Sequence, residues 1–214
     1  MKHTFMRRTA EIAATFGCEL VKFVKISFVV GSTKGMFFSL SQSLSPLLGW
    51  YGGSQSAVAA YGFRTLYAFF TGLGFYASAL YHIPSFCGAL YLSTHSKLVR
   101  TALPLACIVL FLVHPVGKAA FPYALYWLIP AAVPFLPQSF FMQALGTTFV
   151  MHGVGSVIWL YTRTIDASTW SALTSIVWAE RLVYASCMTG AYYAINTLRS
   201  CVPVLKKHYL ALSH

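Results

Sequence analysis

The chain of 214 residues contains 57% hydrophobic, 16% aromatic and only 9% charged residues, and its formal net charge is +11. Soluble domains carry about 25% charged residues, so this composition excludes an ordinary water-exposed surface. A mean hydropathy of +0.66 also excludes a disordered chain, because disordered chains are poor in apolar residues. The composition therefore predicts an integral membrane protein with several crossings.

The excess of positive charge does not indicate nucleic-acid binding. A nucleic-acid interface is a basic face on a polar domain. Here the lysines and arginines lie at the chain ends and in short segments between apolar runs. This distribution is typical of the cytoplasmic flanks of membrane helices, where basic side chains also meet anionic lipid headgroups. We expect membrane lipid, and no nucleic acid, as a partner.

The sequence contains none of the familiar motifs of catalytic or metal sites. The five cysteines show no C-x-x-C spacing, and the seven histidines form no pair separated by four residues. The nucleotide-binding P-loop, H-E-x-x-H and G-x-S-x-G are also absent. We therefore predict no metal site, assign no catalytic residue and leave any cofactor unknown.

Residues 1–25 are predicted to form a basic amphipathic segment on the cytoplasmic side. Ile12, Phe16, Leu20 and Phe23 recur on one face of a helix, with basic residues beside that face. A secretory signal is disfavoured, because charged residues interrupt the apolar stretch that such a signal needs. The alternative is a partly ordered cytoplasmic tail.

Residues 26–198 are predicted to form one transmembrane helical domain, followed by a basic cytoplasmic tail at residues 199–214. A spanning helix needs about 20 mostly apolar residues. On this basis we place six crossings, at residues 26–48, 65–81, 101–113, 119–136, 140–161 and 170–198. The first contains Lys34 and a serine-rich middle, so a broken helix is the alternative there. For the second, the alternative is a kinked or re-entrant continuation to residue 92.

The positions of the basic residues predict the orientation. Ten lysines and arginines fall in the segments assigned to the cytoplasm, whereas only Lys118 and Arg163 fall in the outer loops. The ten are Lys2, Arg7, Arg8, Lys22, Lys25, Lys97, Arg100, Arg199, Lys206 and Lys207. By the positive-inside rule, both termini are cytoplasmic, in the inner or plasma membrane if the protein is bacterial.

A polar stripe in the fifth crossing is the first candidate site. Thr148, His152 and Ser156 are spaced by four residues and share one helix face, and Trp159 joins that face. Polar and ionisable groups within crossings normally face the bundle interior or a water-filled cavity. The stripe therefore predicts ligand-binding groups. The alternative is a histidine that only holds neighbouring helices together.

Glu180 and Arg181 lie in the middle of the last crossing. Consecutive helix residues point about 100° apart, so each can address a different neighbour. A carboxylate within the membrane is a candidate proton or cation site. The alternative is a structural ion pair of Glu180 with Arg64, Lys34 or Lys118.

The remaining candidate residues lie around the start of the fourth crossing. Lys118 or Arg181 can meet an anionic group of a ligand, and Tyr126, Trp127 or Trp159 can cover an apolar ring. Aromatic residues at this depth are also typical of the interfacial belt, which is the alternative for Tyr126 and Trp127. No residue here selects a particular ligand.

The predicted outline, with six crossings, basic cytoplasmic ends, no ATPase motif and a polar and aromatic interior, resembles the substrate-binding (S) subunits of energy-coupling-factor vitamin transporters. The resemblance is one of architecture, with no motif match. It implies an uptake component that binds a small solute, such as a vitamin or cofactor precursor, and works with a separate energising module. Two alternatives are a membrane enzyme that acts on a lipid-like substrate through His152 and Glu180, and an assembly or scaffold subunit of a membrane complex.

Overall fold

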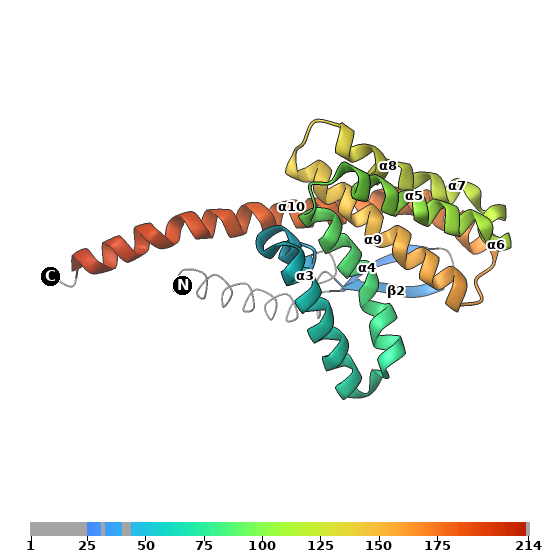
Figure 1. The fold of residues 1–214 in the computed structure, drawn as a ribbon, viewed down its shortest axis with the longest axis horizontal. Helices are drawn as coiled ribbons and strands as arrows, with labels where there is room; N and C mark the ends of the chain where they lie inside the picture. The colour runs from blue at the N-terminus through green and yellow to red at the C-terminus, as the bar shows by residue number, and fades with distance from the viewer. Residues whose placement is uncertain (1–24, 31–32, 40–43, 213–214) are drawn as a thin grey trace.

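The computed structural model describes the backbone of residues 25–30, 33–39 and 44–212 and the side chains of residues 44–72 and 74–198. The predicted amphipathic segment lies outside the described residues, except for Lys25, and so do the side chains of the basic tail. The described chain is mainly helical (Figure 1). The predicted all-α class is therefore confirmed for residues 44–212. The described residues before them form one β-hairpin.

The exception is a β-hairpin where the first helical crossing was predicted. Strands β1 (Lys25–Val30) and β2 (Thr33–Ser39) are antiparallel, with Lys25 opposite Ser39. Ile26, Phe28 and Val30 alternate with other residues in β1, and β-branched and aromatic residues favour strands over helices. The prediction of a helix over residues 26–48 is therefore wrong, and the helical domain begins at residue 47.

A helical hairpin follows, made of α3 (Leu47–Ala68), the π-helical turn η2 (Phe69–Leu73) and α4 (Phe75–Ser93). The chain reverses at Gly72 and Gly74, whose φ angles are +97° and +69°, a region that glycine enters at little cost. This reversal shows that the predicted second crossing at residues 65–81 is wrong. α3 also approaches α4 closely at Gly49, which has no side chain. A Cβ atom there would lie 2.2 Å from the carbonyl oxygen of Ala89.

Next along the chain come α5 (Lys97–Val113) and a broken helical segment. The broken segment comprises α6 (Pro115–Ala119), α7 (Phe121–Ala124), η3 (Leu125–Trp127), α8 (Leu128–Ala132) and η4 (Val133–Phe135). It contains four prolines. Pro115, Pro122 and Pro134 lie at the first or second position of a short helix, where proline favours a new helix start, and Pro130 lies within α8. Residues 101–113 and most of residues 119–136 are thus helical, as predicted.

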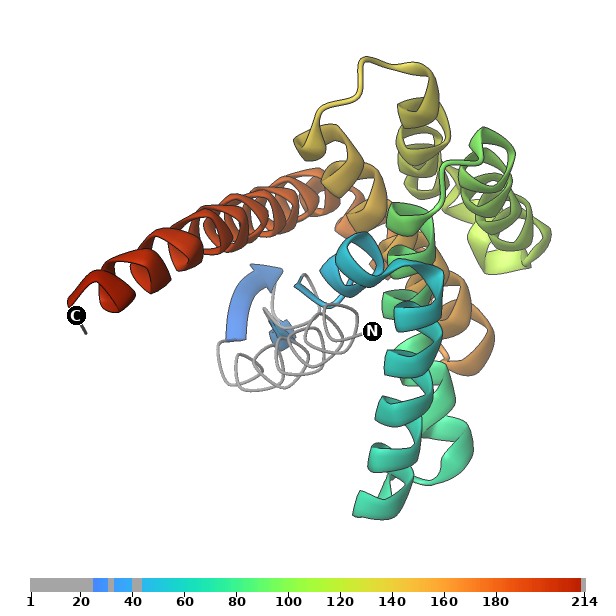
Figure 2. The ribbon, with the colours of Figure 1, turned by 60° about the vertical axis from the view of Figure 1, so that its left-hand side comes forward.

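Two long helices complete the chain, α9 (Phe140–Thr162) and α10 (Ala167–Leu212). They contain the predicted helices at residues 140–161 and 170–198. Figures 1 and 2 show that the second half of α10 runs away from the bundle and that the α3–α4 hairpin projects from it in another direction. The main buried core joins α5, α7, η3, α9 and the first half of α10 through Phe111, Tyr123, Trp127, Phe149 and Trp170.

Within the described ranges, α9 alone is long and apolar enough to cross a membrane by length and hydropathy. It has 23 residues, and 61% of its most apolar window is buried against the rest of the chain. A buried core helix would also meet these two criteria. A shorter apolar helical stretch covers Phe121–Phe135.

Candidate functional site

The polar stripe of α9 faces the core. Thr148 and Ser156 are 1% and 6% exposed, and His152 is half-buried between them. Small residues of α9 permit this close approach, because a Cβ atom on Gly153 would lie only 3.3 Å from the indole of Trp127. The spacing of four residues therefore places the three polar side chains where the sequence predicts them, toward neighbouring helices.

His152 is the centre of a chain of hydrogen bonds. Its Nδ1 lies 3.4 Å from the indole Nε1 of Trp127, and its Nε2 lies 2.8 Å from the hydroxyl of Tyr123. The hydroxyl of Tyr123 lies 3.1 Å from Oγ of Ser156. An indole N–H only donates, so Nδ1 accepts and the proton of the neutral ring is on Nε2. His152 then donates to Tyr123, and either hydroxyl of the Tyr123–Ser156 pair can donate to the other.

Aromatic rings enclose this chain of hydrogen bonds. Tyr123 and Trp170 have ring centroids 5.0 Å apart, and Phe111 lies 5.2 Å from Trp127 and 5.3 Å from Trp170. All four side chains are at most 2% exposed. The edge-to-face contacts suit the quadrupoles of the rings and exclude water from the network.

Glu180 and Arg181, on α10, form an ion pair with each other. Nη2 of Arg181 lies 2.7 Å from Oε2 of Glu180, and each residue is 6% exposed. The structural ion pair with Arg64, Lys34 or Lys118, considered from the sequence, is therefore not the pairing found. Adjacent helix residues diverge at Cβ, but these two side chains are long enough to bend back and meet.

The ion pair adjoins the stripe of α9 through Thr148. Nη1 of Arg181 donates to the carbonyl oxygen of Thr148 at 3.4 Å, and the guanidinium carbon lies 4.7 Å from the ring centroid of Tyr184. Oε1 of Glu180 and Nε of Arg181 are buried and have no hydrogen-bond partner among the described residues, and the same holds for Nε1 of Trp170, ten residues earlier on α10. Buried polar groups normally have a partner, so these atoms can still bind a polar group or water.

The other predicted site residues lie at the edge of this region or outside it. Tyr126 is half-buried, donates from its hydroxyl to the carbonyl oxygen of Thr174 at 2.9 Å and stacks on Phe149. Trp159 is 42% exposed and Lys118 is exposed. The structure thus gathers Thr148, His152, Ser156, Trp127, Glu180 and Arg181, leaves Tyr126 beside them, and separates Trp159 and Lys118 from them.

Sequence reasoning missed Tyr123, which is 2% exposed and contacts both His152 and Ser156. A signal was present, because Tyr123 precedes Trp127 by four residues and so shares its helix face. Trp170, at the start of α10, was used only as a boundary of the last crossing. Its indole nevertheless packs against Tyr123 in the core.

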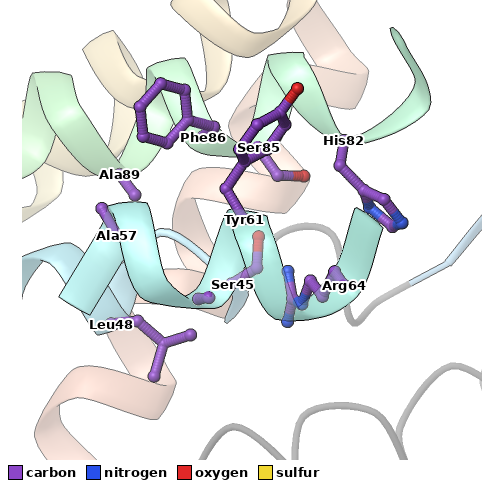
Figure 3. A pocket seen from close by; sticks show the side chains of 10 residues that line it. Ser45, Leu48, Ala57, Tyr61, Arg64, His82, Ser85, Phe86 and Ala89 are labelled. Atoms are coloured by element: carbon purple, nitrogen blue, oxygen red, sulfur yellow. The ribbon is translucent and has the colours of Figure 1, made fainter. Parts of the chain in front are cut away.

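A cleft between α3 and α4 is a second candidate place for a ligand. Its space of about 270 Å³ includes open solvent, and the enclosed part has room for about one water molecule. The kink of α3 at Gly53, where φ is +74°, lies between Leu48 and Ala57 of the lining in the sequence. Figure 3 shows Arg64 and His82 near one end and Leu48 and Ala57 near the other. The lining residues are Ser45, Leu48, Ala57, Ala60, Tyr61, Arg64, His82, Ser85, Phe86 and Ala89.

Within the part of the chain that the structure describes, no three histidine, cysteine or acidic side chains come close enough to hold a metal ion. The arrangement on α9 and α10 offers hydrogen bonds and one ion pair in a setting that excludes water. No known protein family, curated protein or solved structure matches this chain. The site therefore has to be interpreted from its own geometry.

Proposed function

We propose that this chain is a membrane protein with six crossings that binds a small solute and serves as an uptake component without its own ATPase. The six crossings are α3, α4, α5, the broken segment from α6 to η4, α9 and the first part of α10. At about 1.5 Å per residue, the 19 residues of α4 and the 23 of α9 measure ~28 and ~34 Å. These lengths suit a hydrocarbon core of about 30 Å.

The apolar exterior of the α3–α4 hairpin supports a lipid surround. Six large side chains near the turn are at least half exposed. They are Phe63 at 50%, Leu66 at 51%, Tyr67 at 57%, Phe70 at 80%, Phe75 at 57% and Tyr76 at 82%. Large exposed apolar side chains that gather on one hairpin are typical of a contact with a membrane or a protein partner. In a bilayer it faces the acyl chains.

The proposed orientation keeps both termini in the cytoplasm. The turn at residues 94–96, the loop at residues 136–139 and the end of α10 share the cytoplasmic side. The turn at residues 69–74, His114 and the loop at residues 163–166 share the other side. Most basic residues of the sequence then lie on the cytoplasmic side, as the positive-inside rule requires.

One observation carries the solute-binding proposal: the Glu180–Arg181 pair is buried, yet Oε1 and Nε have no hydrogen-bond partner among the described residues. A polar atom left unmet at membrane depth costs free energy, which a polar group of a solute can recover. His152 and Tyr123 add hydrogen-bonding groups, and the surrounding aromatic rings suit an apolar body. The proposed partners are this solute, membrane lipid and a separate energising module.

The alternatives predict different properties. In a scaffold subunit the buried network would only hold α7, η3, α9 and α10 together, and no small molecule would bind. In an enzyme that acts on a lipid-like substrate, His152 and Glu180 would be reached from the lipid phase. The α3–α4 cleft is an alternative position for the solute, because it combines the basic side chains of Arg64 and His82 with an apolar end.

The test begins with native mass spectrometry of the purified protein to identify a bound small molecule and any bound subunit. Equilibrium binding of that solute is then measured for the wild type, His152→Ala and Arg181→Ala. We expect each variant to bind about tenfold to a hundredfold more weakly, because a needed polar partner in a dry site contributes about 1–3 kcal/mol. Trp159→Ala and Lys118→Ala are matched controls and should bind normally, since both side chains are exposed.

Full binding by both His152→Ala and Arg181→Ala would show that the network is structural. Arg64→Ala and His82→Ala locate the site in that case. If these two variants lose binding, the solute occupies the α3–α4 cleft. If all four variants bind the solute as tightly as the wild type does, neither region is the binding site.

A further inference from the structure

We propose that Glu180 and the solute compete for Arg181: a small monocarboxylate with an apolar body pairs with Arg181, and Glu180 takes up one proton when it is displaced. This inference rests on the proposed function, because it assumes that a solute reaches Arg181. It adds the chemical class of the solute and a coupling between solute and proton.

The first step of the argument is the charge balance of the buried pair. A guanidinium stays protonated in proteins, so Arg181 always carries its positive charge. Because Arg181 and Glu180 are each 6% exposed, neither charge is well hydrated, and each needs the other. Two carboxylates beside one guanidinium would bury an uncompensated negative charge. A carboxylate solute therefore requires that Glu180 becomes neutral.

The second step is the geometry of the guanidinium. Its Nε–H and one N–H of Nη2 lie along one edge and can hold a carboxylate through two parallel hydrogen bonds. Glu180 meets only Nη2, at 2.7 Å, and its Oε1 and Nε of Arg181 both lack hydrogen-bond partners among the described residues. Glu180 is the neighbour of Arg181 in the chain, and in the structure it makes only the single contact. A solute carboxylate is not tethered and can take both positions.

The proton balance is simple. Ionised Glu180 accepts one proton from the solvent and becomes a neutral carboxylic acid. The solute anion then forms the ion pair with Arg181, and no covalent bond is made or broken. The total charge of the site stays the same before and after binding, which avoids burying a net charge.

Among the residues whose side chains the structure describes, three other titratable groups face the pair. They are His152 on α9, Tyr123 on α7 and Tyr184 on α10 itself. Nδ1 of His152 already accepts from Trp127, so a proton added there would break that hydrogen bond and place a second positive charge near Arg181. Glu180 is thus the group that takes the proton.

The apolar body of the solute follows from the surroundings of Arg181. The ring centroid of Tyr184 lies 4.7 Å from the guanidinium carbon of Arg181. Benzoate combines a carboxylate with a flat apolar body, and we choose it as the probe. Its binding to the purified full-length protein is measured from about pH 6 to about pH 9, a range over which benzoate itself stays ionised.

We expect the affinity for benzoate to fall tenfold per pH unit wherever free Glu180 is ionised, because one proton is taken up per anion bound. Calorimetry in buffers with different ionisation enthalpies should report the uptake of about one proton. Glu180→Gln, which imitates the neutral acid, should bind benzoate equally well across the range. Asp166→Asn removes an exposed carboxylate from the segment just before α10 and should keep the wild-type slope.

Two further variants test which group takes the proton and which donors hold the anion. His152→Gln should weaken binding but keep the slope, and loss of the slope would assign the proton to His152 instead. Arg181→Lys keeps the charge but lacks the forked donors, so it should bind benzoate more weakly with the same slope. This variant serves where Arg181→Ala does not fold.

The outcomes separate the inference from the proposed function. Benzoate binding that needs Arg181 but does not vary with pH would overturn the proton coupling and leave solute binding intact. Failure to bind benzoate, with a different solute bound through Arg181, would overturn the carboxylate class. If no solute binding depends on Arg181 or His152, the proposed function itself fails at this site.

Discussion

Removing one partner of the Glu180–Arg181 pair should destabilise the fold far more than removing both. Arg181→Met keeps most of the apolar stem but leaves the carboxylate of Glu180, which is 6% exposed, without its 2.7 Å partner. Breaking a buried ion pair in this way costs about 3–5 kcal/mol. Glu180→Gln/Arg181→Met buries no charge, and we expect its free energy of unfolding to lie within about 1 kcal/mol of the wild type.

The assay is equilibrium unfolding of the purified variants in mixed micelles. Intrinsic fluorescence is a suitable signal, because Trp127 and Trp170 are buried in the same core and are 0% and 2% exposed. The coupling energy is obtained from the wild type, the two single variants and the double variant. We expect it to exceed about 2 kcal/mol, as for residues in direct contact within a buried network.

A loss below about 1 kcal/mol for Arg181→Met would refute this reasoning, because an uncompensated buried charge costs several times more. It would mean that the carboxylate of Glu180 is hydrated or already neutral in the folded protein. A double variant as unstable as Arg181→Met would also contradict it, since the loss would then come from packing and not from charge.

Three other predictions test separate parts of the structure. Gly49→Ala should lower the free energy of unfolding by about 1–3 kcal/mol or more, because the new Cβ would meet a backbone oxygen of α4, whereas Gly62→Ala on the same helix has open space and should be neutral or stabilising. Hydroxyl groups in the first turn of α10 donate to Asp166 and hold its pKa below 3.8, so thermal unfolding should show an advantage of the wild type over Asp166→Asn near neutral pH that is lost as the pH falls below 3.8. A topology reporter placed after Leu212 or in residues 95–100 should be cytoplasmic, and one in residues 69–74 should be external; an external signal from either of the first two sites would contradict the orientation.

The later helices and the main polar site were predictable because one regular pattern defines each. Thr148, His152 and Ser156 recur every four residues, and a regular helix must bring them to one face. Residues 140–161 are a continuous run without charged residues between a serine cap and an exposed loop. The predicted boundaries therefore agree closely with those of α9. The pattern in the sequence and the packing in the structure depend on the same helical period.

The early helices were not predictable from hydropathy, because a window average does not locate a chain reversal. Gly72 and Gly74 lie within an apolar run, and the reversal there depends on their positive φ angles. The sequence does contain the two glycines, but their effect depends on the packing of α3 against α4. Residues 26–39 are apolar enough for a helix, yet their alternating β-branched and aromatic residues pair as strands.

The pairing within the site and the α3–α4 cleft depend on relations that the sequence does not encode locally. Adjacent residues on a helix diverge at Cβ, so Glu180 and Arg181 were expected to meet other partners, but side-chain length overrides the backbone direction. The cleft lies between two helices whose boundaries the hydropathy pattern did not predict. Tyr123 is four residues before Trp127, but the sequence does not show that the broken helical segment turns both side chains toward His152.

The central claim is that a solute anion pairs with Arg181, and the resonance of its Nε–H group tests this most directly. Nε of Arg181 has no hydrogen-bond partner among the described residues. We predict that a saturating concentration of benzoate at about pH 6, where benzoate is ionised, shifts the Nε–H signal of protein labelled with nitrogen-15 at arginine downfield, as a charge-assisted hydrogen bond forms. Arg181→Lys identifies the signal by its loss. A signal that does not move while benzoate or the native solute is bound would contradict the claim.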